Sequence, residues 1–109
     1  MSNLGTIEIT GKSGTEYKFL LYAVGQRFKA LGAVYVMLAL ETKGASPWYR
    51  YVYVGETGDL STRFGSHHKQ ECFDKEGVDH IGVHLDSSEK SRKSKESDLL
   101  DAYVWPCND

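Results

Sequence analysis

Apolar and polar residues alternate along the first part of the chain with the two-residue period of a β-strand. Ile7 and Ile9 alternate with polar neighbours, and Phe19 and Leu21 do the same further on. The stretch between these two runs contains two glycines, which favour a turn because glycine accepts positive φ angles. We therefore expect residues 6–22 to form a β-hairpin.

Three further apolar runs predict strands at residues 33–40, 48–54 and 80–85. A loop with glycine and proline separates the first two, and we expect those two strands to pair as an antiparallel hairpin. Residues 23–32 are expected to be a short connection, for which a helix at residues 26–31 remains open.

A helix is expected directly after the strand at residues 48–54. Thr57 or Asp59 can accept a backbone N–H at a helix start, so the helix would run from there to about Gln70. Leu60 and Phe64 are one turn apart on such a helix and would both face the core.

A final helix is expected from about residue 87 to residue 104, ended by Pro106, after a loop at residues 71–79. This order predicts an α+β fold with a small three-stranded, mostly antiparallel central sheet flanked by helices. The N-terminal hairpin is expected to be extra to that sheet. Residues 1–31 would then hold the hairpin and its connection, and residues 32–109 the catalytic core of a single domain.

Composition and charge limit the functional classes. The chain has 109 residues, 40% apolar and 26% charged, which suits one domain with one modest core. The formal net charge of −2 argues mildly against non-specific DNA binding, because that binding depends on phosphate neutralisation. The basic run from Lys90 to Lys95 is equally consistent with a solvated helix face and with a local basic face.

Neither a spanning apolar run nor a signal segment is visible, so a cytoplasmic location is expected.

The two cysteines, Cys72 and Cys107, form no short-spaced pair. In a cytosolic chain we expect them to be free thiols rather than a disulfide. The alternative is a zinc site, in which His67, His68 and Cys72 would be joined by Cys107 or His84. This spacing matches no common zinc signature.

Six side chains supply the groups needed to cut a phosphodiester with one hard metal ion. They are the phenols of Tyr35 and Tyr53, the guanidinium of Arg63, the imidazole of His67, the carboxylate of Glu96 and the amide of Asn108. Hydrolysis needs an activated water, charge stabilisation on the phosphoryl oxygens and help for the leaving oxygen. A Mg²⁺ ion held by one carboxylate and several waters suits this task.

The order of these residues resembles that of the GIY-YIG nuclease domains. The family carries Gly-Ile-Tyr and Tyr-Ile-Gly triplets on neighbouring strands, and the matching segments here are Ala33-Val34-Tyr35 and Tyr53-Val54-Gly55. A helix then carries an arginine with a tyrosine or histidine one turn later, which Arg63 and His67 match. The resemblance covers about residues 32–108.

The resemblance implies a DNA endonuclease that depends on Mg²⁺ or Mn²⁺. The metal-binding glutamate of the family matches Glu96, and its closing asparagine matches Asn108. Tyr35 and His67 would activate water, and Arg63 would hold the scissile phosphate. The glycine of the second triplet, at position 55, would allow close approach of the backbone.

Two residues depart from the family pattern. Ala33 replaces the first glycine, and Glu56 lies where some repair-type members carry a lysine. The glutamate removes one phosphate contact and favours an alternative, a catalytically weak or inactive domain that binds nucleic acid or protein. The aromatic strand at residues 48–53 would then be a docking surface. Specificity for DNA would have to come from the hairpin, the loops, a dimer or a partner protein.

Overall fold

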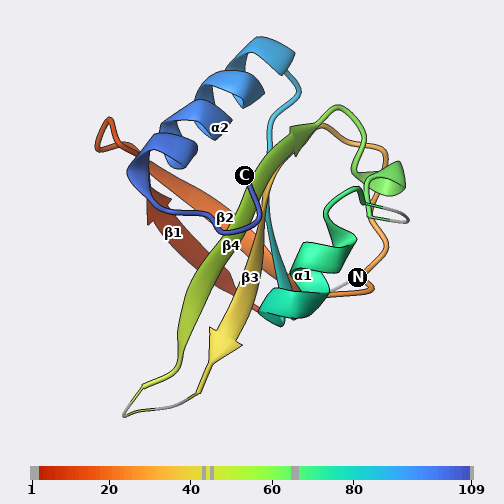
Figure 1. The fold of residues 1–109 in the computed structure, drawn as a ribbon. Helices are drawn as coiled ribbons and strands as arrows, with labels where there is room; N and C mark the ends of the chain where they lie inside the picture. Colours follow the sequence, from red (N-terminus) through yellow and green to blue (C-terminus); the bar gives the residue numbers. More distant parts are fainter. Residues whose placement is uncertain (1–2, 43, 45, 65–66, 109) are drawn as a thin grey trace.

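Five antiparallel strands form one sheet in the order β1-β2-β5-β3-β4 (Figure 1). The computed structural model describes residues 3–42, 44, 46–64 and 67–108. The strands are β1 (Thr6–Thr10), β2 (Glu16–Ala23), β3 (Ala33–Glu41), β4 (Trp48–Thr57) and β5 (His80–Leu85). The helical elements are the 3₁₀ turn η1 (Leu60–Thr62) and the α-helices α1 (Gln70–Glu76) and α2 (Glu89–Ala102).

The expected three-stranded sheet with an extra hairpin is wrong. β2 pairs with β5 from Leu20 opposite Val83 to Ala23 opposite His80, so the hairpin belongs to the same α+β sheet. The physical reason is that β5 lies inside the sheet and needs hydrogen-bonding partners along both edges. Gly82 permits this close packing, because a Cβ there would lie 2.7 Å from a methyl group of Val36 on β3.

The two α-helices cover opposite faces of the sheet (Figure 1). Phe73 of α1 packs in one buried cluster with Tyr35 and Met37, whereas Leu99 of α2 packs in the other with Val36. Residues Ala33 to Ala39 of β3 are all buried, since this strand contributes alternate side chains to both clusters. The side of the sheet under α1 therefore holds both tyrosines of the two triplets.

The helix expected from residue 57 or 59 to residue 70 is also wrong. β4 continues to Thr57, which pairs with Ala33, and only the short turn η1 follows, with the Asp59 side chain accepting from the backbone N–H of Ser61. Residues 65–66 lie outside the described part of the chain. The expected loop at residues 71–79 instead contains α1, which Gly77 ends with a φ of 75°.

The remaining elements agree more closely with expectation. α2 is shorter at both ends than the expected span of residues 87–104, because Ser88 caps its start and Tyr103 takes an extended conformation. The connection at residues 23–32 contains no helix.

Across the described ranges, no helix combines the length and the apolar character needed to cross a bilayer.

The expected free thiols are wrong as well. Cys72 of α1 and Cys107 of the C-terminal segment form a disulfide, with a Cα–Cα distance of 5.8 Å. The bond joins residues 35 positions apart in the chain, a separation that gives no spacing signal. It fastens α1 to the segment that runs along the outer edge of β4, where the backbone N–H of Cys107 donates to the carbonyl of Val52.

Candidate active site

The phenol oxygen of Tyr35 is the centre of a buried polar cluster. β3 carries Tyr35 into the face beneath α1, where its side chain is fully buried. The Nε–H of Arg63 donates to this oxygen over 2.8 Å, and Nε2 of His67 lies 2.8 Å from the same atom. The structure therefore brings Arg63 and His67 together at one oxygen, although the two residues do not share a helix.

A second contact of His67 fixes the position of its proton. The backbone N–H of Lys69 donates to Nδ1 of His67 over 3.0 Å, so Nδ1 carries no hydrogen. A neutral imidazole then carries its proton on Nε2, which makes Nε2–H the donor to the Tyr35 oxygen. Tyr35 thus accepts two hydrogen bonds, and its own O–H points to a third direction. In this arrangement His67 donates to the phenol oxygen and does not accept the phenol proton.

Burial sets the protonation states of this pair. Burial and, to a smaller extent, the positive charge of Arg63 lower the pKa of His67 to about 4, so the imidazole is neutral at pH 7. Burial also raises the pKa of Tyr35 well above its ordinary value, although the hydrogen bond from Arg63 opposes this effect. At neutral pH the cluster is a neutral phenol and a neutral imidazole beside one permanent cation.

Tyr53 and Phe73 enclose the imidazole with aromatic surface. The ring centroids of Tyr53 and Phe73 lie 5.1 Å and 4.8 Å from that of His67. Tyr53 lies on this face because it pairs with Met37, which belongs to the same cluster. The register of β4 against β3 shifts only after this pair, between Met37 and Leu38. The two tyrosine rings are 6.0 Å apart, so both triplet tyrosines belong to one cluster.

Gly55 lies on β4 beside the phenol of Tyr35, and Asn108 bonds to the same strand. Gly55 lies opposite Tyr35 in the β3–β4 pairing, and a Cβ on Gly55 would lie 2.7 Å from the Tyr35 phenol oxygen. The Asn108 amide accepts from the N–H of Val54 over 2.9 Å and donates to the carbonyl of Val54 over 2.8 Å. Asn108 therefore closes the free edge of β4 one residue before Gly55, and among the described residues its side chain bonds to the backbone of Val54.

Glu96 approaches the cluster from the other side of the sheet, on α2. Burial raises the pKa of its carboxyl group, the negative charge of Glu56 adds to this rise, and the positive charges of Arg63 and Lys93 oppose it. Among the described residues Glu96 forms no hydrogen bond or ion pair with Tyr35, Arg63 or His67, so its link to the cluster is this electrostatic influence. Within the described ranges Glu96 forms no ion pair, because Lys93 pairs with Glu89 instead.

Arg92 is a buried cation, although it belongs to the basic run from Lys90 to Lys95. Its side chain is 7% exposed, its Nε–H donates to Glu56 over 2.9 Å, and its Nη1 donates to the backbone carbonyl of Asp86. A Cβ on Gly32 would lie 2.6 Å from Nη1, so this glycine makes room for the guanidinium. Glu56 thus balances a buried charge, for which a lysine at the same position would be unsuited.

Two lysines of the run from Lys90 to Lys95 form ion pairs with acidic side chains. Lys93 pairs with Glu89 over 3.7 Å, and Lys95 pairs with Asp86 over 2.9 Å. These contacts favour a solvated helix face over a basic face for the run from Lys90 to Lys95. The zinc alternative loses both of its thiol ligands to the disulfide.

Glu96 is the side chain suited to hold a hard cation. Mg²⁺ keeps most of its waters and is often held by one or two carboxylates. The Glu96 carboxyl group is half-buried and next to another carboxylate, a situation that a cation would relieve. The described residues contain no group of three or more histidine, cysteine or acidic side chains that could hold an ion. An ion at this position would have Glu96 as its main protein ligand and would keep most of its waters.

Comparison of the chain with models of protein families, with curated proteins and with solved structures finds no match. The functional assignment therefore rests on the chemistry of the side chains and on the resemblance of the motifs.

Proposed function

We propose that this chain is a Mg²⁺-dependent DNA endonuclease of the GIY-YIG type, which hydrolyses phosphodiester bonds. The observation that carries the proposal is the pair of hydrogen bonds that Arg63 and His67 direct at the phenol oxygen of Tyr35. Clusters of titratable groups with perturbed pKa values are typical of functional sites. The motif resemblance supplies the reaction class for this cluster.

Arg63 is the proposed phosphate contact. Its Nε–H is used by Tyr35, and Tyr53 also interacts with the guanidinium. The side chain is partly exposed, so the outer side of the guanidinium can reach the oxygens of a phosphate. Holding Nε on a buried phenol fixes the direction of this fork before the substrate arrives.

Tyr35 is the proposed group that orients the attacking water. Its raised pKa keeps the phenol protonated at pH 7, so the phenol positions the water and does not remove its proton. The N–H groups of Arg63 and His67 hold the phenol oxygen in place for this role. A Mg²⁺ ion on Glu96 would supply charge neutralisation for the phosphoryl and leaving oxygens.

One observation favours the alternative of a binding domain without catalytic activity. Tyr35 is completely buried and His67 is 5% exposed, so both residues would also serve as satisfied core groups. On that account Arg63 and Glu96 would form a surface for nucleic acid, and no bond would be cut. The two accounts differ in whether Mg²⁺ produces cleavage.

Incubation of supercoiled plasmid with the purified chain separates these accounts. We expect nicking with Mg²⁺ and none with EDTA, and a loss of about 10²–10³-fold in rate for Arg63→Ala. Glu96→Gln should abolish cleavage and weaken Mn²⁺ binding in a calorimetric titration. Glu89→Gln is the matched control, because Glu89 lies on the same helix in an exposed pair with Lys93. Equal cleavage by wild type and Glu96→Gln would overturn the proposal.

A further inference from the structure

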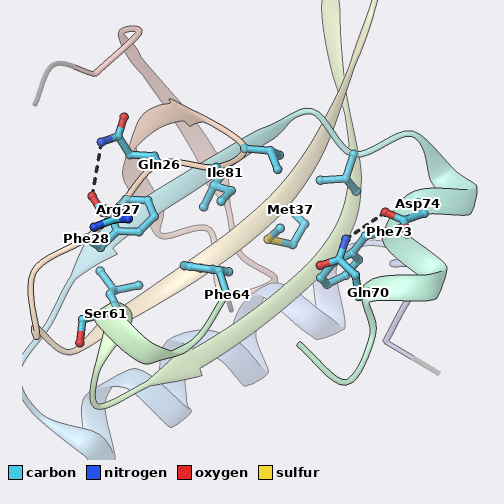
Figure 2. Close-up of a pocket in the computed structure, with 14 residues that line it drawn as sticks. Gln26, Arg27, Phe28, Met37, Ser61, Phe64, Gln70, Phe73, Asp74 and Ile81 are labelled. Carbon is cyan, nitrogen blue, oxygen red and sulfur yellow. Dashed lines mark hydrogen bonds between the residues drawn. The ribbon is translucent and has the colours of Figure 1, made fainter. Parts of the chain in front are cut away.

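A hollow of about 520 Å³ opens beside the candidate active site, on the face of the sheet covered by α1. Its volume lies in the range of about 300–1,000 Å³ that is usual for small-molecule pockets. Figure 2 shows that Phe28, Met37 and Phe64, which come from three separate segments, surround it. We call this hollow the α1-side pocket.

Two rings of the pocket wall also touch the candidate active site. The Phe64 ring packs edge-on against Tyr35 at 5.1 Å between centroids, and Phe73 packs against His67 at 4.8 Å. Phe64 also directly follows Arg63 in the chain. A group in the pocket would therefore lie next to a phosphate held by Arg63.

The walls of the pocket combine aromatic surface with a polar rim. Phe28 and Phe64 lie 5.5 Å apart and form one continuous aromatic wall. At the rim Gln70 donates from its amide to the carboxylate of Asp74 over 2.9 Å, which leaves its amide oxygen to accept a hydrogen bond (Figure 2). Gln26 adds a second amide. Stacking surface with amide and carboxylate groups at its edge is the chemistry that recognises a nucleobase.

The rim carries one cation besides the carboxylate of Asp74. Arg27 lines the pocket, is exposed, and makes no side-chain ion pair or hydrogen bond within the described ranges. Together with Arg63 it would provide two guanidinium groups near the aromatic wall. A base paired in an intact duplex is held in its stack, so only an unstacked base can enter a pocket of this kind.

We infer that the α1-side pocket receives one unstacked nucleobase, next to the phosphate that Arg63 holds. This inference rests on the proposed function and narrows its substrate to DNA with a bulged or single-stranded nucleotide. Stacking of a base on an aromatic side chain increases affinity by at least about fivefold. The chain should therefore bind DNA with a base at the unstacked position more tightly than DNA that lacks a base there.

The test compares two labelled duplexes by fluorescence anisotropy in EDTA, one with a single bulged adenine and one with an abasic nucleotide in the same bulge. Wild type should bind the adenine bulge at least about fivefold more tightly. Phe28→Ala should remove this preference, and so should Val24→Trp, which fills the mouth of the pocket from a half-exposed position. Trp48→Ala, which deletes an exposed aromatic ring outside the pocket, should keep it.

The outcomes distinguish this inference from the proposed function. Equal affinity of wild type for the two bulges would overturn the base pocket, and so would a preference that persists in both Phe28→Ala and Val24→Trp. Either result leaves Mg²⁺-dependent cleavage of plasmid unaffected. Conversely, a base preference without any cleavage would support the pocket and contradict the nuclease.

Discussion

His67 gives a stability prediction that depends on pH. Its pKa is about 4 in the folded chain against an ordinary value of 6.5. Between these two values the unfolded chain binds a proton at His67 that the folded chain does not, so stability falls as pH falls. This difference between the two pKa values, at about 1.36 kcal/mol per pH unit, sets an upper limit of about 3.4 kcal/mol for the stability lost on acidification from pH 7.

The structural origin of this loss is the pair of hydrogen bonds on the imidazole. Protonation of Nδ1 would set a new N–H against the N–H of Lys69, with which Nδ1 now forms an accepted hydrogen bond. The added charge would also lie beside Arg63, whose guanidinium already lowers the pKa of His67. We expect the slope of unfolding free energy against pH to approach about 1.4 kcal/mol per unit between pH 6 and pH 4.5.

Urea unfolding at several pH values measures this slope, with His67→Gln as the matched variant. Glutamine cannot titrate and can still donate an N–H toward Tyr35. Other groups contribute in both proteins: Asp86 and Asp98 have lowered pKa values and lose their stabilisation at lower pH, whereas Glu96 has a raised pKa and acts with the opposite sign. The difference between the two slopes therefore isolates His67. Identical slopes for wild type and variant would refute the reasoning.

Three further substitutions test the residues that support the fold around the Tyr35 cluster. Gly55→Ala should destabilise the fold by about 1–3 kcal/mol, because its Cβ would meet the Tyr35 phenol at 2.7 Å, whereas Gly58→Ala, whose nearest contact is 3.5 Å, should cost less in the same urea titration. Cys72→Ser should cost about 2–4 kcal/mol, and dithiothreitol should bring wild type to the same midpoint. Asn108→Ala removes two hydrogen bonds to Val54 and should cost about 2 kcal/mol; fast amide hydrogen exchange at Val54 only in the variant would confirm the cause.

The strands could be predicted from the sequence, but their order in the sheet could not. Alternation along each strand is local, so β3 and β5 were expected within a residue of their actual bounds. The pairing of β2 with β5 joins segments about sixty residues apart, and the local pattern of neither segment specifies its partner. The one-turn spacing of Leu60 and Phe64 suggested a helix, whereas continued pairing of β4 to Thr57 left room only for η1.

The residues of the candidate site could be predicted only in part, because the order of motifs is visible in the sequence but the burial of each side chain is not. The motif order identified Tyr35, Arg63 and His67, which the structure joins at one oxygen. It did not identify Arg92, because a buried arginine and a solvated one look the same in a basic run. The tautomer of His67 was equally hidden, since it depends on a backbone N–H two residues later.

Single-turnover cleavage by Tyr35→Phe tests the central claim most directly. The substitution keeps the buried ring and removes the one oxygen that joins Arg63 and His67. We expect Mg²⁺-dependent cleavage of a DNA duplex by wild type, a loss of at least about 10²-fold in Tyr35→Phe, and DNA binding that is retained. Tyr49→Phe, on β4 away from the cluster, should cleave at the wild-type rate. A Tyr35→Phe variant that is folded and cleaves as fast as wild type would contradict the account, as would a wild type that does not cleave with Mg²⁺.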